Sequence, residues 1–147
     1  MVVTVKVVTW EEGGELAQAI RRQVFIEEQG VPPEIEQDGL DPACAHVLAF
    51  CGEIAVGTGR LYPIEPNTHR AKIGRLAVLP AYRRQGIGSR LLQELLAEAR
   101  RQGYQQVYLH AQAGAYSFYL RHGFIAYGEP FVEAGIPHRR MGIILPV

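Results

Sequence analysis

The stretch IGRLAVLPAYRRQGIGS, from Ile73 to Ser89, decides how the rest of the chain is interpreted. Its pattern predicts a buried strand that ends near Pro80, a short turn, and a helix that begins at Gly86 and Gly88. The start of a helix presents up to four unpaired N–H groups and a partial positive charge, and both favour an anion. Glycine has no Cβ, so a phosphate can approach the backbone closely. The sequence therefore predicts an anion-binding turn.

The side chains of the turn narrow the choice of anion. Arg83 and Arg84 add positive charge and Ser89 adds a hydroxyl donor, whereas a plain strand-to-helix connection would need only the glycines. A P-loop requires a lysine directly after its second glycine, but Ser89 follows Gly88. A Rossmann fingerprint requires a third glycine where Leu91 stands. Neither nucleotide motif fits the turn well.

Hydrophobic periodicity gives the order of elements on both sides of this turn. Gly13 and Gly14 are expected to break the first strand, and residues 31–45 and 131–138 are expected to be loops, as is a turn at 63–67. The order predicts an α+β fold with a single mixed, mostly antiparallel sheet flanked by helices. The expected strands are 2–10, 46–51, 54–61, 71–78, 107–109, 124–127 and 141–145, and the expected helices are 16–29, 88–102 and 115–121.

Composition limits the class of protein. The 147 residues fit one domain, and 48% hydrophobic with 20% charged residues is typical of a globular chain. A net charge of zero argues against a general nucleic-acid partner. Cys44 and Cys51 lack the spacing of a zinc site, and Cys51 is expected in the core. Neither a signal-peptide pattern nor an 18-residue apolar run is visible, so we expect a cytoplasmic protein with no membrane partner.

Several segments together resemble the GNAT N-acetyltransferase superfamily. The run RRQGIG, residues 83–88, matches its cofactor motif Q/R-x-x-G-x-G/A, and LAVLPAYR at 76–83 resembles the preceding strand and turn. The run FYLRHGF at 118–124 resembles the F-Y-x-x-x-G-F segment of the family. VFIEEQGVP at 24–32 and FVEAGIPHRRM at 131–141 are similar to the small bacterial ElaA/YjcF-like branch. The resemblance covers nearly the whole chain and implies a single N-acetyltransferase domain over residues 1–147 with the acyl-CoA N-acyltransferase fold.

The resemblance also implies where a co-substrate would bind. Acetyl-CoA would be the co-substrate, with no metal, and its pantetheine arm would lie along the backbone of Leu76, Ala77 and Val78. An amide near Val78 would then polarise the thioester carbonyl. The pyrophosphate would be held by the turn, formed by Arg83, Arg84, Gln85, Gly86, Ile87, Gly88 and Ser89.

Catalytic residues are expected on the segments that follow. Tyr119 matches the position from which family members protonate the departing thiolate, although a tyrosine on a short helix is also typical of a core. The sequence offers Glu28, His110 and His138 as candidate general bases, and histidine is suited because its pKa lies near neutrality. Each of the three could instead be structural, and many members of the superfamily deprotonate the amine through ordered water.

The expected activity is direct transfer of an acetyl group to a primary amine of a small molecule or peptide. The acidic residues Glu34, Glu36, Asp38 and Asp41 could attract such a cation or merely keep their loop soluble. Two alternatives remain: a non-catalytic CoA-binding or sensing module of the same fold, and another nucleotide enzyme. The sequence does not determine the oligomeric state, and a homodimer is one of the states it allows.

Overall fold

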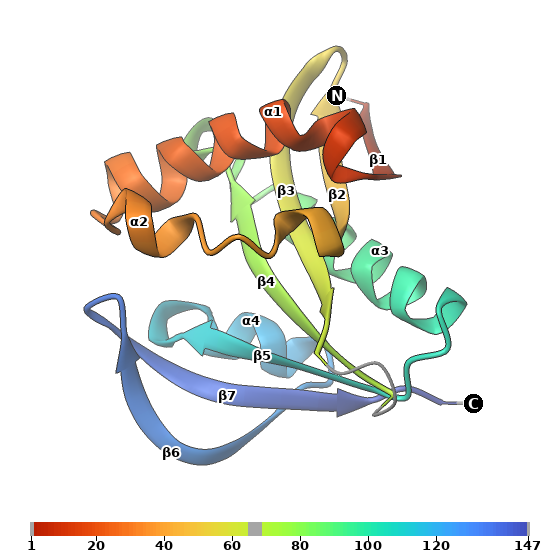
Figure 1. Ribbon diagram of the computed structural model, residues 1–147, viewed down its shortest axis with the longest axis vertical. Helices are drawn as coiled ribbons and strands as arrows, with labels where there is room; N and C mark the ends of the chain where they lie inside the picture. The colour runs from red at the N-terminus through yellow and green to blue at the C-terminus, as the bar shows by residue number, and fades with distance from the viewer. Residues whose placement is uncertain (1, 65–68, 147) are drawn as a thin grey trace.

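One mixed sheet organises the protein (Figure 1). The computed structural model describes residues 2–64 and 69–146, so residues 65–67 of the expected turn lie outside it. Within this part the sheet has seven strands in the order β1-β2-β3-β4-β5-β7-β6, and β4–β5 is its one parallel pair. The strands are β1 (Val3–Val8), β2 (Ala45–Cys51), β3 (Ile54–Pro63), β4 (Arg70–Val78), β5 (Gln106–Gln112), β6 (Ile125–Glu133) and β7 (Ile136–Ile144). The expected α+β fold with a mostly antiparallel sheet is confirmed.

Helices cover both faces of the sheet, α1 in front and α3 behind in Figure 1. The amphipathic helix α3 buries its leucine stripe in the larger core, which also holds Cys51 as expected. The helix α1 packs on the other face, where Ala17 and Ile20 contact the β2 and β4 side chains Leu48 and Ala77. The helices are α1 (Trp10–Arg21), α2 (Pro33–Glu36), α3 (Ile87–Arg101) and α4 (Tyr116–Arg121), joined by η1 (Arg22–Glu28), η2 (Asp41–Ala43), η3 (Pro80–Tyr82) and η4 (Ala113–Ala115).

The first helix begins six residues earlier than expected. Thr9 caps it and forms a capping box with Glu12, with bonds of 3.1 and 2.8 Å. Gly13 and Gly14 are therefore inside α1, and the expectation that they break the chain was wrong. A Cβ on Gly13 would lie 2.6 Å from Cγ2 of Val8. The glycines are needed for close packing of the helix rather than for a turn.

The C-terminal strands are longer than their hydrophobic patterns indicated. The expected loop at residues 131–138 is the end of a β6–β7 hairpin, which turns at Ala134 and Gly135 with φ of 51° and 76°. Its partners Phe131 and His138 face each other in register. The candidate residue His138 and its neighbour Glu133 therefore lie on paired strands rather than on a loop.

The parallel pair β4–β5 comes apart halfway along its length. Pairing runs from Arg70 opposite Gln106 to Ile73 opposite Leu109 and then ends, although both strands continue. Directly after the last pair, β4 contains a bulge at Arg75, whose φ is 53°, and the β3 register shifts at the same level. The two strands consequently diverge (Figure 1). Beyond the last pair, β4 and β5 no longer pair with each other, and the facing edge of each strand is bare.

Candidate active site

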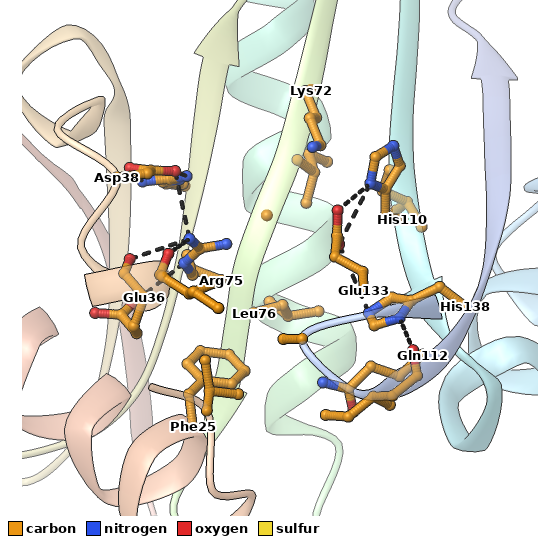
Figure 2. A pocket seen from close by; sticks show the side chains of 18 of the residues that line it. Phe25, Glu36, Asp38, Lys72, Arg75, Leu76, His110, Gln112, Glu133 and His138 are labelled. Carbon is orange, nitrogen blue, oxygen red and sulfur yellow. Dashed lines mark hydrogen bonds and ion pairs between the residues drawn. The ribbon is translucent and has the colours of Figure 1, made fainter. Parts of the chain in front are cut away.

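A cleft of about 380 Å³ lies where β4 and β5 separate. Its walls come from η1, α2, β3, β4, β5 and the β6–β7 hairpin, so distant parts of the sequence meet there. Figure 2 shows Arg75 with Glu36 and Asp38 on one side of the cleft and His110 with Glu133 on the other. The cleft is thus lined by charged groups on both sides and by the bare edge of β4 between them.

The exposed edge of β4 offers hydrogen-bond donors. The amide of Leu79 donates to the carbonyl of Val56 on β3 at 2.8 Å. Successive amides of a strand point to opposite sides, so those of Val78 and Leu76 point toward the gap that β5 has left. Leu76 also lines the cleft. These backbone groups are available to a ligand that enters between the strands.

The turn between β4 and α3 has the backbone conformation of an anion site. Arg84 and Gly86 have φ of 64° and 80°, and no side chain caps the helix. The first bond within the helix runs from the amide of Arg90 to the carbonyl of Gly86, 3.2 Å apart. The amides of Ile87, Gly88 and Ser89 therefore have no acceptor within α3.

Arg83 and Glu28 are held together beside this turn. Both terminal nitrogens of Arg83 donate to Glu28 at 2.7 Å, and its Nε donates to the carbonyl of Val78 at 2.9 Å. The bonds from Arg83 lower the pKa of Glu28. Neither residue lines the cleft. Both oxygens of the Glu28 carboxylate are bonded to Arg83, so Glu28 is a poor proton acceptor for a substrate in the cleft.

Tyr119 is both a core residue and a cleft residue. Its ring packs edge-on against Phe118 and Phe124, and the side chain is 8% exposed. It also lines the cleft on the side of α4. Burial raises the pKa of its phenol to about 12. The phenol therefore keeps its proton at neutral pH and can donate it.

His110 and Glu133 form a hydrogen-bonded pair on the side of the cleft that faces Arg75 (Figure 2). His110 Nδ1 lies 3.1 Å from Oε1 of Glu133. An ionised carboxylate only accepts, so Nδ1 donates and Nε2 of the neutral ring is left as a base. Burial and the charge of Lys72 lower the pKa of His110, against the opposing effect of Glu133. The ring is consequently neutral, and able to accept a proton, at physiological pH.

His138 lies beside this pair. Its Nδ1 donates to the carbonyl of Ile136 at 2.6 Å, and its Nε2 is 3.8 Å from Oε2 of Glu133. The ring stacks on Phe131 at 5.7 Å between centroids. His110 and His138 are thus brought to one carboxylate, while Glu28 lies elsewhere.

The acidic loop residues have a structural role that was not expected. Asp41 and Glu36 bind the buried Arg21 at 2.7 and 2.8 Å. Asp38 pairs with both Arg60 and Arg75. In addition, Asp41 pairs with Arg60, and Glu36 pairs with Arg75. We call these residues the acid–arginine network: Arg21, Arg60, Arg75, Glu36, Asp38 and Asp41. Burial would raise the pKa of Asp38, but the bonds from Arg60 and the Leu40 amide outweigh it and lower the pKa to about 2. Three of the four acids are therefore neutralised by arginine, and they fix the loop onto β3 and β4.

In residues 2–64 and 69–146, His, Cys, Asp and Glu side chains form no group of three or more that could hold a metal ion. Over the same residues, no helix has the length and apolar character needed to cross a membrane.

Comparisons with known proteins agree with this geometry. A model of the acetyltransferase (GNAT) domain matches residues 11–145. The uncharacterized N-acetyltransferase YjcF of Bacillus subtilis is 36% identical over 123 residues, which cover 83% of this chain and 86% of that protein. The crystal structure of Escherichia coli ElaA has a TM-score of 0.87 at 26% identity, and an acyl-CoA N-acyltransferase from Pseudomonas aeruginosa has 0.82 at 32%; both alignments cover 96% of this chain and 99% of the other. The chain belongs to the GNAT acetyltransferase family.

Proposed function

We propose that this protein transfers the acetyl group of acetyl-CoA directly to a primary amine of a small molecule or peptide. The observation that carries the proposal is the separation of β4 and β5 beside a cleft that is lined by both the phenol of Tyr119 and the imidazole of His110. The N-acyl transfer from acyl-CoA named for the Pseudomonas aeruginosa relative supports it.

The cofactor-binding groups are backbone amides. The amides of the turn, from Arg84 to Ser89, donate hydrogen bonds to the pyrophosphate, and Gly86 allows close approach because a side chain is absent there. The edge of β4 at Leu76, Ala77 and Val78 takes the pantetheine arm in place of the missing strand. Arg83 contributes by bonding the carbonyl of Val78 and by fixing Glu28 rather than by direct contact with the cleft.

Two side chains move the protons of the reaction. The acceptor ammonium gives one proton to Nε2 of His110, whose other nitrogen is held by Glu133. The free amine attacks the thioester carbonyl, whose oxygen is stabilised by the amide of Val78. The carbon–sulfur bond breaks, and Tyr119 gives its proton to the departing thiolate. The attacking nitrogen loses its second proton to the phenolate of Tyr119, and His110 releases its proton to solvent. The amide product and the free thiol of CoA leave the cleft.

The direct test is release of the CoA thiol from acetyl-CoA in the presence of polyamines, amino sugars and lysine peptides. We expect amine-dependent release with at least one of these classes and an acetylated amine of equal amount by mass spectrometry. Tight CoA binding without turnover on any amine would favour the alternative, a non-catalytic CoA-binding or sensing module. Stabilisation by ATP or NAD in preference to acetyl-CoA, at matched concentrations, would exclude both.

The pH dependence of kcat/KM tests the His110–Glu133 pair. Since the pKa of His110 is lowered from 6.5, its inhibitory protonation begins below that pH, and kcat/KM should fall only on the acid side of about 6.5. In Glu133→Gln the negative charge that raises the pKa of His110 is lost and Nδ1 keeps only a neutral acceptor, so the acid limb should move to still lower pH. The measurement is kcat/KM for one amine between pH 5 and 9.

His110→Gln is the comparison for this profile. It should lower kcat/KM about 100- to 10,000-fold, the usual contribution of a general base, and abolish the limb. An acid limb at the same pH in all three proteins would assign the deprotonation to water or to His138.

A further inference from the structure

Lys72 lies in the cleft and transfers no proton in the chemistry described above, where its charge acts only by lowering the pKa of His110. Its neighbours Ala71 and Ile73 are buried in the core, so the alternation of β4 turns Lys72 to the other face of the sheet. The register sets it between Tyr62 on β3 and Tyr108 on β5. In Figure 2 its ammonium lies on the same side of β4 as the His110–Glu133 pair. The side chain lines the cleft together with that pair.

Among the described residues, Lys72 has no partner for its charge, unlike the other cations of the cleft. Arg60 and Arg75 are both engaged by the acids of the acid–arginine network. For Lys72, the described residues contain no carboxylate oxygen within 4.0 Å and no hydrogen-bond acceptor; the ring centroid of Tyr108 is 5.9 Å away. Glu133, the acid whose charge acts most on Lys72, is bonded to His110.

A cation in such a position is costly to the free protein. Burial lowers the pKa of Lys72, against the effect of Glu133, so the charged form is disfavoured relative to an exposed lysine. A half-buried charge without a partner destabilises a protein unless a ligand pairs with it. The ammonium is compact and has three rotatable donors, which suits carboxylate and phosphate oxygens alike.

We propose that Lys72 binds an anionic group of the acceptor, so that the preferred substrates are amines that also carry a carboxylate or a phosphate. This inference rests on the proposed acetyl transfer. The same face of the sheet then presents a cation for the anionic group and the His110–Glu133 pair for the ammonium. The acceptor is held by both ends of its charge distribution, and its amine is oriented toward the edge of β4.

Matched pairs of amines that differ only by the anionic group provide the test. Lysine is compared with cadaverine, and O-phosphoethanolamine with ethanolamine, and their contrast distinguishes a carboxylate from a phosphate. In at least one pair, we expect kcat/KM for the amine that carries the anionic group to exceed that of the amine without it by about 10- to 100-fold, the range for a hydrogen bond to a charged group. In Lys72→Met this ratio should fall close to one, chiefly through a higher KM for the anionic member.

Two further variants separate a specific contact from a general effect. Lys72→Arg keeps the charge and should keep most of the preference. Lys6→Met makes the same chemical change at the other lysine of the chain, on β1 outside the cleft, and should leave the ratio as in the unmodified protein. The use of ratios cancels any effect of the variants on the chemical step.

The outcomes distinguish this inference from the proposed function. Acetylation of both members of each pair with equal kcat/KM, or a preference that survives in Lys72→Met, would overturn the role of Lys72 and leave the acetyl transfer intact. If no amine is acetylated, calorimetric binding of lysine and of O-phosphoethanolamine to the CoA-loaded protein decides. Binding that is weakened about 10-fold or more in Lys72→Met supports the anion contact, and binding that is unchanged or undetectable in both proteins refutes it.

Discussion

Replacing Tyr119 by phenylalanine is expected to lower kcat about 100- to 10,000-fold, the usual range for loss of a general acid. The ring would still pack against Phe118 and Phe124, so the core should be preserved. Only the phenolic proton is lost, and with it the source from which the thiolate is neutralised. The measurement is steady-state thiol release at saturating amine, with the dissociation constant for CoA measured separately by calorimetry.

Tyr104→Phe is the matched control. Tyr104 is a partly buried tyrosine packed against the same core after α3, and it does not line the cleft. Removal of the Tyr104 hydroxyl should leave kcat within about two-fold of the unmodified protein, because this hydroxyl lies outside the cleft. If Tyr119→Phe and Tyr104→Phe have equal kcat, the thiolate takes its proton from water and Tyr119 is a core residue only.

Replacing Arg21 by methionine is expected to destabilise the protein by about 3–5 kcal/mol, the usual cost of breaking a buried ion pair. Arg21 is 1% exposed and donates to both Glu36 and Asp41, and its guanidinium lies 5.6 Å from the ring centroid of Trp10. Methionine keeps much of the side-chain volume but leaves two buried carboxylates with fewer donors. Urea denaturation should show the loss as a lower midpoint with an unchanged m-value.

The adjacent residue provides the control for this change. Arg22 is exposed and its pair with Glu27 is long, at 3.6 Å. Arg22→Met should therefore change the free energy of unfolding by no more than about 0.5 kcal/mol. A loss of similar size at the two positions would mean that the acid–arginine network does not hold the loop of residues 31–45 in place.

The elements with strong periodicity were predictable from the sequence. The leucine stripe of α3 has a helical period, and the apolar runs of β2, β3 and β4 are short and bounded by turn residues, which favours strands. The N-terminal helix was misjudged because Gly13 and Gly14 look like breakers, whereas their role depends on the distance to Val8 across the fold. Tertiary packing overrode local propensity there.

The site was predictable only where a motif marks it. The glycines of the turn and the Tyr119 segment carry such a pattern. Glu133 lies on a strand whose polar residues hide its length, so its bond to His110 had no sequence signal. Along Ala71, Lys72 and Ile73 the residues alternate between apolar and charged, which indicates that Lys72 faces away from the core. The sequence does not indicate that Lys72 faces a cleft, because the cleft exists only where β4 and β5 separate.

A crystal structure with bound CoA tests the central claim most directly, namely that the co-substrate binds where β4 and β5 separate. We expect the pyrophosphate on the amides of residues 84–89, the pantetheine along Leu76 and Val78, and the thiol within hydrogen-bond reach of the Tyr119 hydroxyl. CoA bound at another surface, with the edge of β4 left unoccupied, would contradict it.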